Sequence, residues 1–162
     1  MKLEETIRVT RYISAQLLRD TKILAALADA IDGEDRQVAL AGAAVLMGLS
    51  AIEAALHEAA LLTRPHLYTN AYRRMSVNQK YLRLRGADSK PLKRLVYLRN
   101  ALAHSEPENE RGRDLSKCFN ARAAAEITEQ VILVCRDIWG TEMPKWYSDV
   151  AFPCEPSSGH IP

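Results

Sequence analysis

An arginine, an asparagine and a histidine stand close together near the end of a helix-like segment, as Arg99, Asn100 and His104. Asn100 and His104 are four residues apart, so on a helix they share a face and the amide can orient the imidazole. Histidine suits acid–base chemistry because its unperturbed pKa, about 6.5, lies near physiological pH. Arg99 points roughly 140° away from His104 on an ideal helix. The two side chains therefore converge only at a frayed helix end, by the reach of Arg99, or across a dimer interface.

Arg99 is expected in apolar surroundings, because one arc of the same helix carries Leu92, Leu95, Val96, Leu102 and Ala103. A guanidinium that faces a core is costly unless it is paired, so Arg99 should find a carboxylate or face a polar cleft. Glu53 is the candidate partner, since it shares an apolar helix face with Ser50 and His57. In that role Glu53 supports Arg99 and does not react. The simpler interpretation of Glu53 and His57 is two core polar residues satisfied by local hydrogen bonds.

Positive charge is concentrated in one part of the chain. Residues 64–104 hold ten Lys or Arg against one acid, a net charge of +9, while the remainder carries −7. Tyrosines at positions 68, 72 and 81 are interleaved with these cations, as a surface that tracks phosphates and stacks bases would need. RNA is the natural partner, and a solvated charged face is the alternative. The candidate RNA-binding residues are Arg73, Arg74, Lys80, Arg83, Arg85 and Lys93.

Several other classes of site are disfavoured. Cys118, Cys135 and Cys154 are widely spaced, with no Cys-x-x-Cys pair and no flanking histidine, so reduced thiols are expected and zinc is not. His57 and Glu58 lack the second histidine of a zinc-protease helix, and no phosphate-binding glycine loop or Gly-x-Ser-x-Gly elbow occurs. We therefore expect neither a metal nor a cofactor.

The periodicity of the apolar residues predicts an all-α fold of four to five helices in an up-and-down bundle, with two long helices first. The expected helices span residues 3–31, 35–63, 77–85, 89–104 and 120–139, with Ser89 as an N-cap and Gly86 closing the third. Residues 105–117 are expected to form a loop. One helical domain would cover residues 1–143, followed by an irregular tail over residues 144–162 that is rich in proline and serine. Trp139, Trp146 and Tyr147 are expected to pack the chain end onto the helices.

The most apolar stretch, residues 38–52, is short for the roughly 20 residues of a membrane-spanning helix and reads as a buried core helix. The first five residues include Lys2, Glu4 and Glu5, where a signal peptide would need an apolar core. A cytoplasmic location without a membrane partner is expected.

The segment Arg99-Asn100-x-x-x-His104 resembles the signature of the HEPN superfamily, an arginine followed by a polar residue and a histidine after four intervening positions. The helical layout is similar too, with a long first helix, an apolar second helix and the motif shortly before the last one. The resemblance does not extend to the tail. It implies a HEPN-like helical bundle, and a homodimer in which the two motifs face each other and form one composite site.

The resemblance further implies a metal-independent endoribonuclease, of the toxin or phage-defence kind. His104 would act as general base or acid around the ribose 2′-hydroxyl, Arg99 would hold the phosphate and stabilise its developing charge, and Asn100 would position. Some toxins of this family are silenced by a partner that modifies a tyrosine two positions after the histidine. Glu106 stands there, which argues against that form of regulation, although an antitoxin or regulatory protein is still possible. The alternative is a non-catalytic dimerisation or interaction module, in which Arg99 and His104 are a structural pair at the helix end.

Overall fold

Helices make up nearly all of the structure, a computed structural model that describes residues 3–103 and 119–153. The all-α prediction is confirmed, because these residues contain no strand. The α-helices are α1 (Leu3–Ala30), α2 (Glu34–Thr63), α3 (Asn70–Arg74), α4 (Val77–Arg85), α5 (Lys90–Ala103), α7 (Ala121–Trp139) and α8 (Lys145–Ala151). Two 3₁₀ turns, Pro65–Leu67 and Gly140–Glu142, join neighbouring helices. The predicted loop at residues 105–117 lies outside the described residues.

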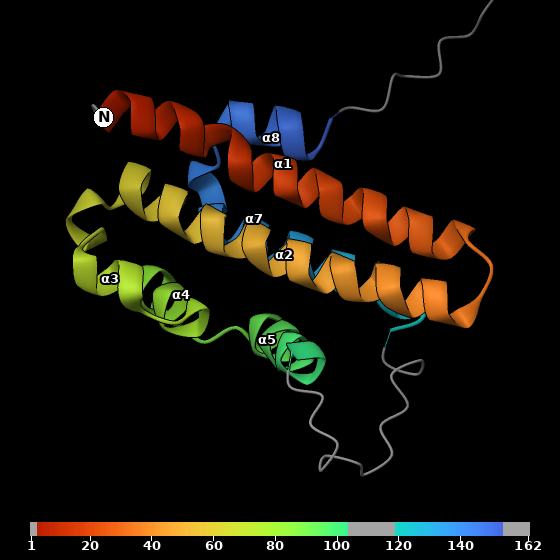
Figure 1. Cartoon of the computed structure of the whole chain (residues 1–162). Coiled ribbons are helices and arrows are strands. Elements are labelled where there is room, and N and C mark those ends of the chain that lie inside the picture. The colour runs from red at the N-terminus through yellow and green to blue at the C-terminus, as the bar shows by residue number, and fades with distance from the viewer. Residues whose placement is uncertain (1–2, 104–118, 154–162) are drawn as a thin grey trace, which may run out of the picture.

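The long helices α1 and α2 form a hairpin, and α7 packs against both of them (Figure 1). The turn between α1 and α2 depends on Gly33, whose φ of +105° disfavours residues with a side chain. On the side of α2 away from α1 lie α3, α4 and α5 (Figure 1). The core therefore sits between α1, α2 and α7, and α5 closes it by packing on α2 and α7.

Local capping explains where the shorter helices begin and end. Ser76 and Gln79 form a reciprocal capping box at the start of α4, and Gly86 ends that helix in the left-handed conformation, with φ of +76°. The Ser89 hydroxyl accepts from the Leu92 amide at 3.2 Å, which confirms Ser89 as the N-cap of α5. Asn120 caps α7 in the same way through the Ala123 amide, at 2.8 Å.

The predicted irregular tail is wrong for residues 145–151, which form α8 and pack on α1. The physical reason is aromatic packing at long range. Tyr147 is fully buried, with its ring centroid 5.3 Å from that of Trp139 and 5.8 Å from that of Trp146. The expected packing of these aromatic residues against the helices is confirmed. Residues 154–162 of the tail lie outside the described residues.

The apolar helix α2 is long and apolar enough to cross a membrane by length and composition. Half of its most apolar window is buried inside the protein, and the core helix of a soluble protein meets the same criterion. Two sides of it are covered by α1 and α7.

Close contact between α2 and α7 occurs at a glycine. A Cβ built on Gly48 would lie 2.6 Å from a methyl group of Val131 and 3.5 Å from one of Thr21. Gly48 thus marks the point where α1, α2 and α7 meet with no room for another carbon. Gly42, two turns earlier, is different, since a Cβ there would make ordinary contact with Leu102 of α5 at 3.5 Å.

One carboxyl group is buried between α1 and α2. Glu58 is only 2% exposed, and both the backbone N–H and the hydroxyl of Ser14 donate hydrogen bonds to its carboxylate oxygens. Burial raises the pKa of Glu58 from an ordinary value of 4.5 to about 7, against the opposite effect of the Ser14 hydrogen bonds. The fold therefore favours the protonated form of this side chain.

We predict that Gly48→Ala destabilises the protein by about 1–3 kcal/mol, because the stiff Val131 side chain must move to admit the new methyl group. The matched control is Gly42→Ala, in which the methyl group fits and the helix gains about 0.5–1 kcal/mol from its higher propensity. Urea unfolding of both variants gives the two free energies. Equal effects at the two positions would show that the contact at Gly48 is not a constraint.

Glu58 gives the protein a pH-dependent stability of defined sign. Because its pKa is about 7 in the folded protein and 4.5 is its ordinary value, its contribution is fully present below about pH 4.5 and is lost as the pH rises through 7. The loss is on the order of 3 kcal/mol. In Glu58→Gln this dependence disappears. The free energy of unfolding of the variant should therefore rise relative to that of the wild type between pH 5 and pH 8, as measured by urea unfolding. The control Glu129→Gln, an exposed carboxylate on α7, should keep the wild-type dependence.

Candidate functional site

The end of α5 carries the two described residues of the predicted motif. Arg99 is half-buried, and its Nε and Nη2 atoms donate to Oδ1 of Asn100 at 3.3 Å and 3.1 Å. The neighbouring amide, rather than a carboxylate, thus holds the guanidinium in one orientation. His104, the predicted titrating residue, lies outside the described residues, and so does its predicted contact with Asn100.

The apolar side of α5 fixes where Arg99 and Asn100 lie. Leu92 and Leu95 are fully buried, and Leu102 packs beside Gly42 of α2. Their spacing at three and seven residues commits this side of the helix to the core. Asn100 is exposed, and Arg99 is placed at the edge between core and surface. The motif residues therefore stand at the rim of the bundle, on a helix that the core holds firmly.

The predicted pairing of Glu53 with Arg99 is not what the structure contains. Glu53 is paired with Lys80 of α4, with 2.5 Å between Oε1 and Nζ. Lys80 is only 2% exposed, so a carboxylate is needed beside it. The prediction was wrong because helix-face arguments identify a residue that needs a partner, but they do not identify which neighbouring helix supplies it. Glu53 is a support residue for α4 and not for the motif.

The basic segment is only partly a surface. Arg73, Arg74 and Arg83 are exposed, whereas the buried Lys80 is unable to contact RNA and that prediction was wrong. Arg85 lies 3.8 Å from a carboxylate oxygen of Asp137 on α7, and Lys93 lies 2.5 Å from one of Asp88. Exposed cations therefore remain on α3, α4 and α5, and two of the predicted residues, Arg85 and Lys93, are in ion pairs.

The tyrosines predicted to stack on bases pack inside the protein instead. Tyr72 and Tyr81 are 1% and 4% exposed, and the Tyr72 hydroxyl donates to the Leu56 carbonyl at 3.1 Å. Tyr68 is half-buried, and its hydroxyl lies 3.3 Å from Nδ1 of His57. These side chains anchor α3 and α4 to α2 rather than present rings to a ligand.

His57 has the local hydrogen bond that the simpler interpretation expected. Its ring is half-buried and meets Tyr68 and Tyr72 edge to face, with centroids 5.7 Å and 6.2 Å away. Burial and then the charge of Lys80 lower the pKa of His57 below its ordinary 6.5, against a smaller raising effect of Glu53. The neutral imidazole is therefore favoured at neutral pH.

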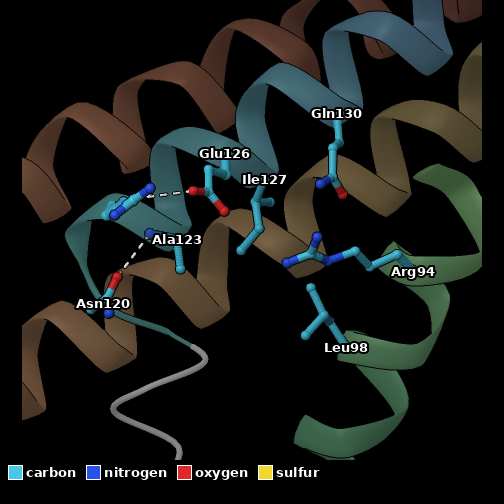
Figure 2. A pocket seen from close by; sticks show the side chains of 8 residues that line it. Arg94, Leu98, Asn120, Ala123, Glu126, Ile127 and Gln130 are labelled. Atoms are coloured by element: carbon cyan, nitrogen blue, oxygen red, sulfur yellow. Dashed lines mark hydrogen bonds and ion pairs between the residues drawn. The ribbon is translucent and has the colours of Figure 1, made fainter.

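A pocket between α5 and α7 was not foreseen in the sequence. It has a volume of about 310 Å³, and Figure 2 shows side chains from both helices around it. Its lining residues are Arg94, Leu98, Asn120, Arg122, Ala123, Glu126, Ile127 and Gln130. The only sequence signal was the polar side of the last helix, where Arg122, Glu126 and Gln130 recur every four residues. The sequence of α7 does not indicate that Arg94 of α5 lies opposite these residues.

Metal-ligating residues do not gather within residues 3–103 and 119–153, where no three His, Cys, Asp or Glu side chains lie close enough to hold an ion. The single described cysteine, Cys135, is buried, and burial raises the pKa of its thiol to about 12. Such a thiol is a core residue and a poor nucleophile.

Comparison with protein-family models, with curated proteins and with solved structures gave no match to this chain.

We predict that substitutions of Lys80 and Glu53 shift the pKa of His57 in opposite directions. Lys80→Met removes the second cause of the lowered pKa of His57, so that pKa should rise. Glu53→Gln removes the carboxylate that raises it, so the pKa of His57 should fall. An NMR titration of the His57 ring signals measures both changes.

The same pair of variants should differ in stability. Glu53→Gln leaves a buried ammonium without its partner and should cost about 1–3 kcal/mol, whereas Lys80→Met replaces the charge by an apolar side chain of similar length and should be nearly neutral. If both variants moved the His57 signals in one direction, the ion pair would not control this imidazole.

Proposed function

We propose that this protein is a metal-independent endoribonuclease of the HEPN type, which acts as a cytoplasmic homodimer in a toxin or phage-defence role. The observation that carries the proposal is the Arg99–Asn100 arrangement at the rim of the bundle, where an amide oxygen holds a guanidinium in one orientation. The biological role rests on the resemblance of the motif alone.

In the proposed reaction the ribose 2′-oxygen attacks the adjacent phosphorus and the bond to the 5′-oxygen of the next nucleotide breaks. The products are a 2′,3′-cyclic phosphate and a free 5′-hydroxyl. His104 takes the proton from the 2′-hydroxyl or supplies one to the leaving oxygen. Arg99 donates to the phosphate oxygens, where negative charge develops, through a planar group that suits bidentate contact.

Asn100 has a modified role in this proposal. From the sequence we expected Asn100 to orient the imidazole of His104, whereas its Oδ1 atom accepts hydrogen bonds from Arg99. An arginine held in one orientation loses less side-chain entropy when it binds a phosphate, so Asn100 is a positioning residue for Arg99. Asn100 touches neither the phosphate nor the reacting atoms.

A dimer is proposed because Arg99 and His104 would lie on different faces of one helix, so a single helix would not bring both groups to the same phosphate. Arg99 and the position of His104 are roughly 140° apart about the axis of an ideal helix. A second copy related by a twofold axis would bring the arginine of one subunit to the histidine of the other. The exposed arginines of α3 and α4 (Arg73, Arg74 and Arg83) support RNA as the substrate, since they provide positive charge for the flanking phosphates.

The test is cleavage of mixed RNA by the purified protein in the presence of EDTA. The wild type should leave 2′,3′-cyclic phosphate ends, and both Arg99→Ala and His104→Ala should lower the rate by at least about 100-fold. Asn100→Ala should lower it less, by about tenfold, because Arg99 keeps its charge and loses its orientation. The matched control is Arg19→Ala, which removes an exposed arginine from α1.

Circular dichroism and sedimentation would establish that each variant is folded and has the oligomeric state of the wild type. The proposal fails if the wild type does not cut RNA, or if all variants cut it equally. RNA binding without cleavage would instead favour the non-catalytic interaction module.

A further inference from the structure

The second helix, α2, has an apolar side that no other described helix covers. In Figure 1, α7 lies behind α2, α1 lies on one side of it, and α3, α4 and α5 lie on the other. On the remaining side, which we call the α2 stripe, Leu46 is 49% exposed. At about 100° per residue this side is roughly opposite Gly48, where α2 meets α7. The α2 stripe consists of Ala39, Ala43, Leu46, Met47, Ser50 and Ala54, all exposed or half-buried.

The α2 stripe lacks the charges that the outer side of a helix normally carries. Residues 37–52 contain no Asp, Glu, Lys or Arg. A surface helix of a soluble protein carries charged and polar residues on the side away from the core, and a helix that is apolar all round is buried. The hydroxyl of Ser50 donates to the Leu46 carbonyl at 3.0 Å, so this donor is already satisfied within α2. The α2 stripe is therefore suited to burial against a second apolar surface.

The order of residues along the α2 stripe suits a second copy of the same stripe. Read from either end, the steps are four, three, one, three and four residues, with Leu46 and Met47 at the centre and small residues on both sides. An interface across a twofold axis uses the same patch on both subunits, so that patch must fit itself. In an antiparallel pair with the axis between Leu46 and Met47, Ala43 lies opposite the partner's Ser50, and the alanines at the two ends of the stripe meet in the same way. Small residues then face small residues, which allows two helices to pack closely.

The charges at the two ends of α2 favour this antiparallel arrangement. Residues 32–36, at the start of α2, hold three acids and one arginine, a net charge of −2. Residues 64–74, which follow its end, hold three arginines and no acid, a net charge of +3. The hydrogen bond from the Tyr72 hydroxyl to the Leu56 carbonyl keeps α3 beside that end. In an antiparallel pair the acidic end of each copy lies beside the basic end of the other, so their electrostatic fields are complementary.

We propose that the α2 stripe is the interface of a homodimer, in which the two α2 helices pack antiparallel with the twofold axis between Leu46 and Met47. The inference rests on the proposed function in one respect, because the composite site requires two motifs to come together. The interface itself is measured without RNA.

The antiparallel arrangement also places the two motifs at the same edge of the dimer. The twofold axis of an antiparallel pair runs across both helices, so each α5 stays on its own side of α2 and the two α5 helices become neighbours. Leu102 of α5 packs beside Gly42, about 4.5 residues from the axis, so the two contact points are roughly 14 Å apart along α2. Arg99 stands about one turn before Leu102 on α5. A parallel pair would place the two motifs at opposite edges, where they form no composite site.

The experiment is sedimentation equilibrium of the full chain over a range of concentrations. The wild type should be a dimer, and Leu46→Glu should weaken dimerisation by at least about 100-fold, because it brings two carboxylates together at the axis. The matched control is Leu133→Glu, since Leu133 is 57% exposed on α7, outside the α2 stripe. That variant should dimerise as the wild type does. Circular dichroism should show all three proteins equally helical, because both leucines are exposed.

Three results would overturn the proposal. They are a monomeric wild type, a dimer that Leu46→Glu leaves unchanged, and equal weakening by Leu46→Glu and Leu133→Glu. A monomeric wild type that floats with vesicles of phosphatidylcholine and phosphatidylglycerol, and no longer does so in Leu46→Glu, would assign the α2 stripe to a lipid surface instead.

A double-mutant cycle tests the antiparallel orientation. Ala43→Glu and Ser50→Arg should each weaken dimerisation by at least about tenfold, because each places a charge against an uncharged surface. In the double variant each new carboxylate lies opposite the partner's new guanidinium, so it should dimerise at least about tenfold more strongly than either single variant. In a parallel pair like charges would meet instead, and a double variant weaker than both single ones would overturn the orientation.

The two proposals fail in different ways. A dimer that Leu46→Glu dissociates but that cuts no RNA would contradict the nuclease and leave the interface. RNA cleavage by a protein whose dimer Leu46→Glu does not affect would contradict the interface and leave the nuclease.

Discussion

The structure depends on the close approach of α1, α2 and α7 around Gly48. Because no Cβ separates α2 from Val131 at this point, α7 lies against the α1–α2 hairpin closely enough to bury the core between them. Three other helices pack on this triple: α8 on α1, α4 on α2, and α5 on α2 and α7. The position of α5 matters most, since that helix carries both the motif residues and one wall of the pocket. The geometry of the candidate site is thus a consequence of packing some distance from it.

Much of the fold could be predicted because its determinants are local. The apolar periodicity identified the long helices, and the predicted signals Gly86 and Ser89 mark the end of α4 and the start of α5 in the structure. The short helices α3 and α8 escaped, since five and seven residues give too little periodicity to recognise. For α8 the stabilising contacts are with Trp139 and with α1, which are remote in sequence. The pattern of residues within one short segment does not indicate contacts with residues that are remote in sequence.

For the site residues too, local features were predicted correctly and contacts between helices were not. Sequence placed Arg99 and Asn100 on a half-apolar helix, and both are there, but it gave Arg99 the wrong partner and counted Lys80 among the surface cations. Both errors concern which helix lies opposite a residue. A charged residue is exposed only on average. The sequence does not distinguish a lysine that is buried beside a carboxylate from one that is in contact with solvent. The pocket escaped for the same reason, since Arg94 and Gln130 belong to different helices and meet only in the folded protein.

Because the pocket and the motif share α5, they are fixed relative to each other. Arg94 and Arg99 are five residues apart, which on a helix is roughly 7.5 Å along the axis and about 140° around it. Arg94 therefore faces α7, while Arg99 stands at another edge of the helix. The core behind α5 therefore keeps the distance between this pocket and the residues Arg99 and Asn100 constant.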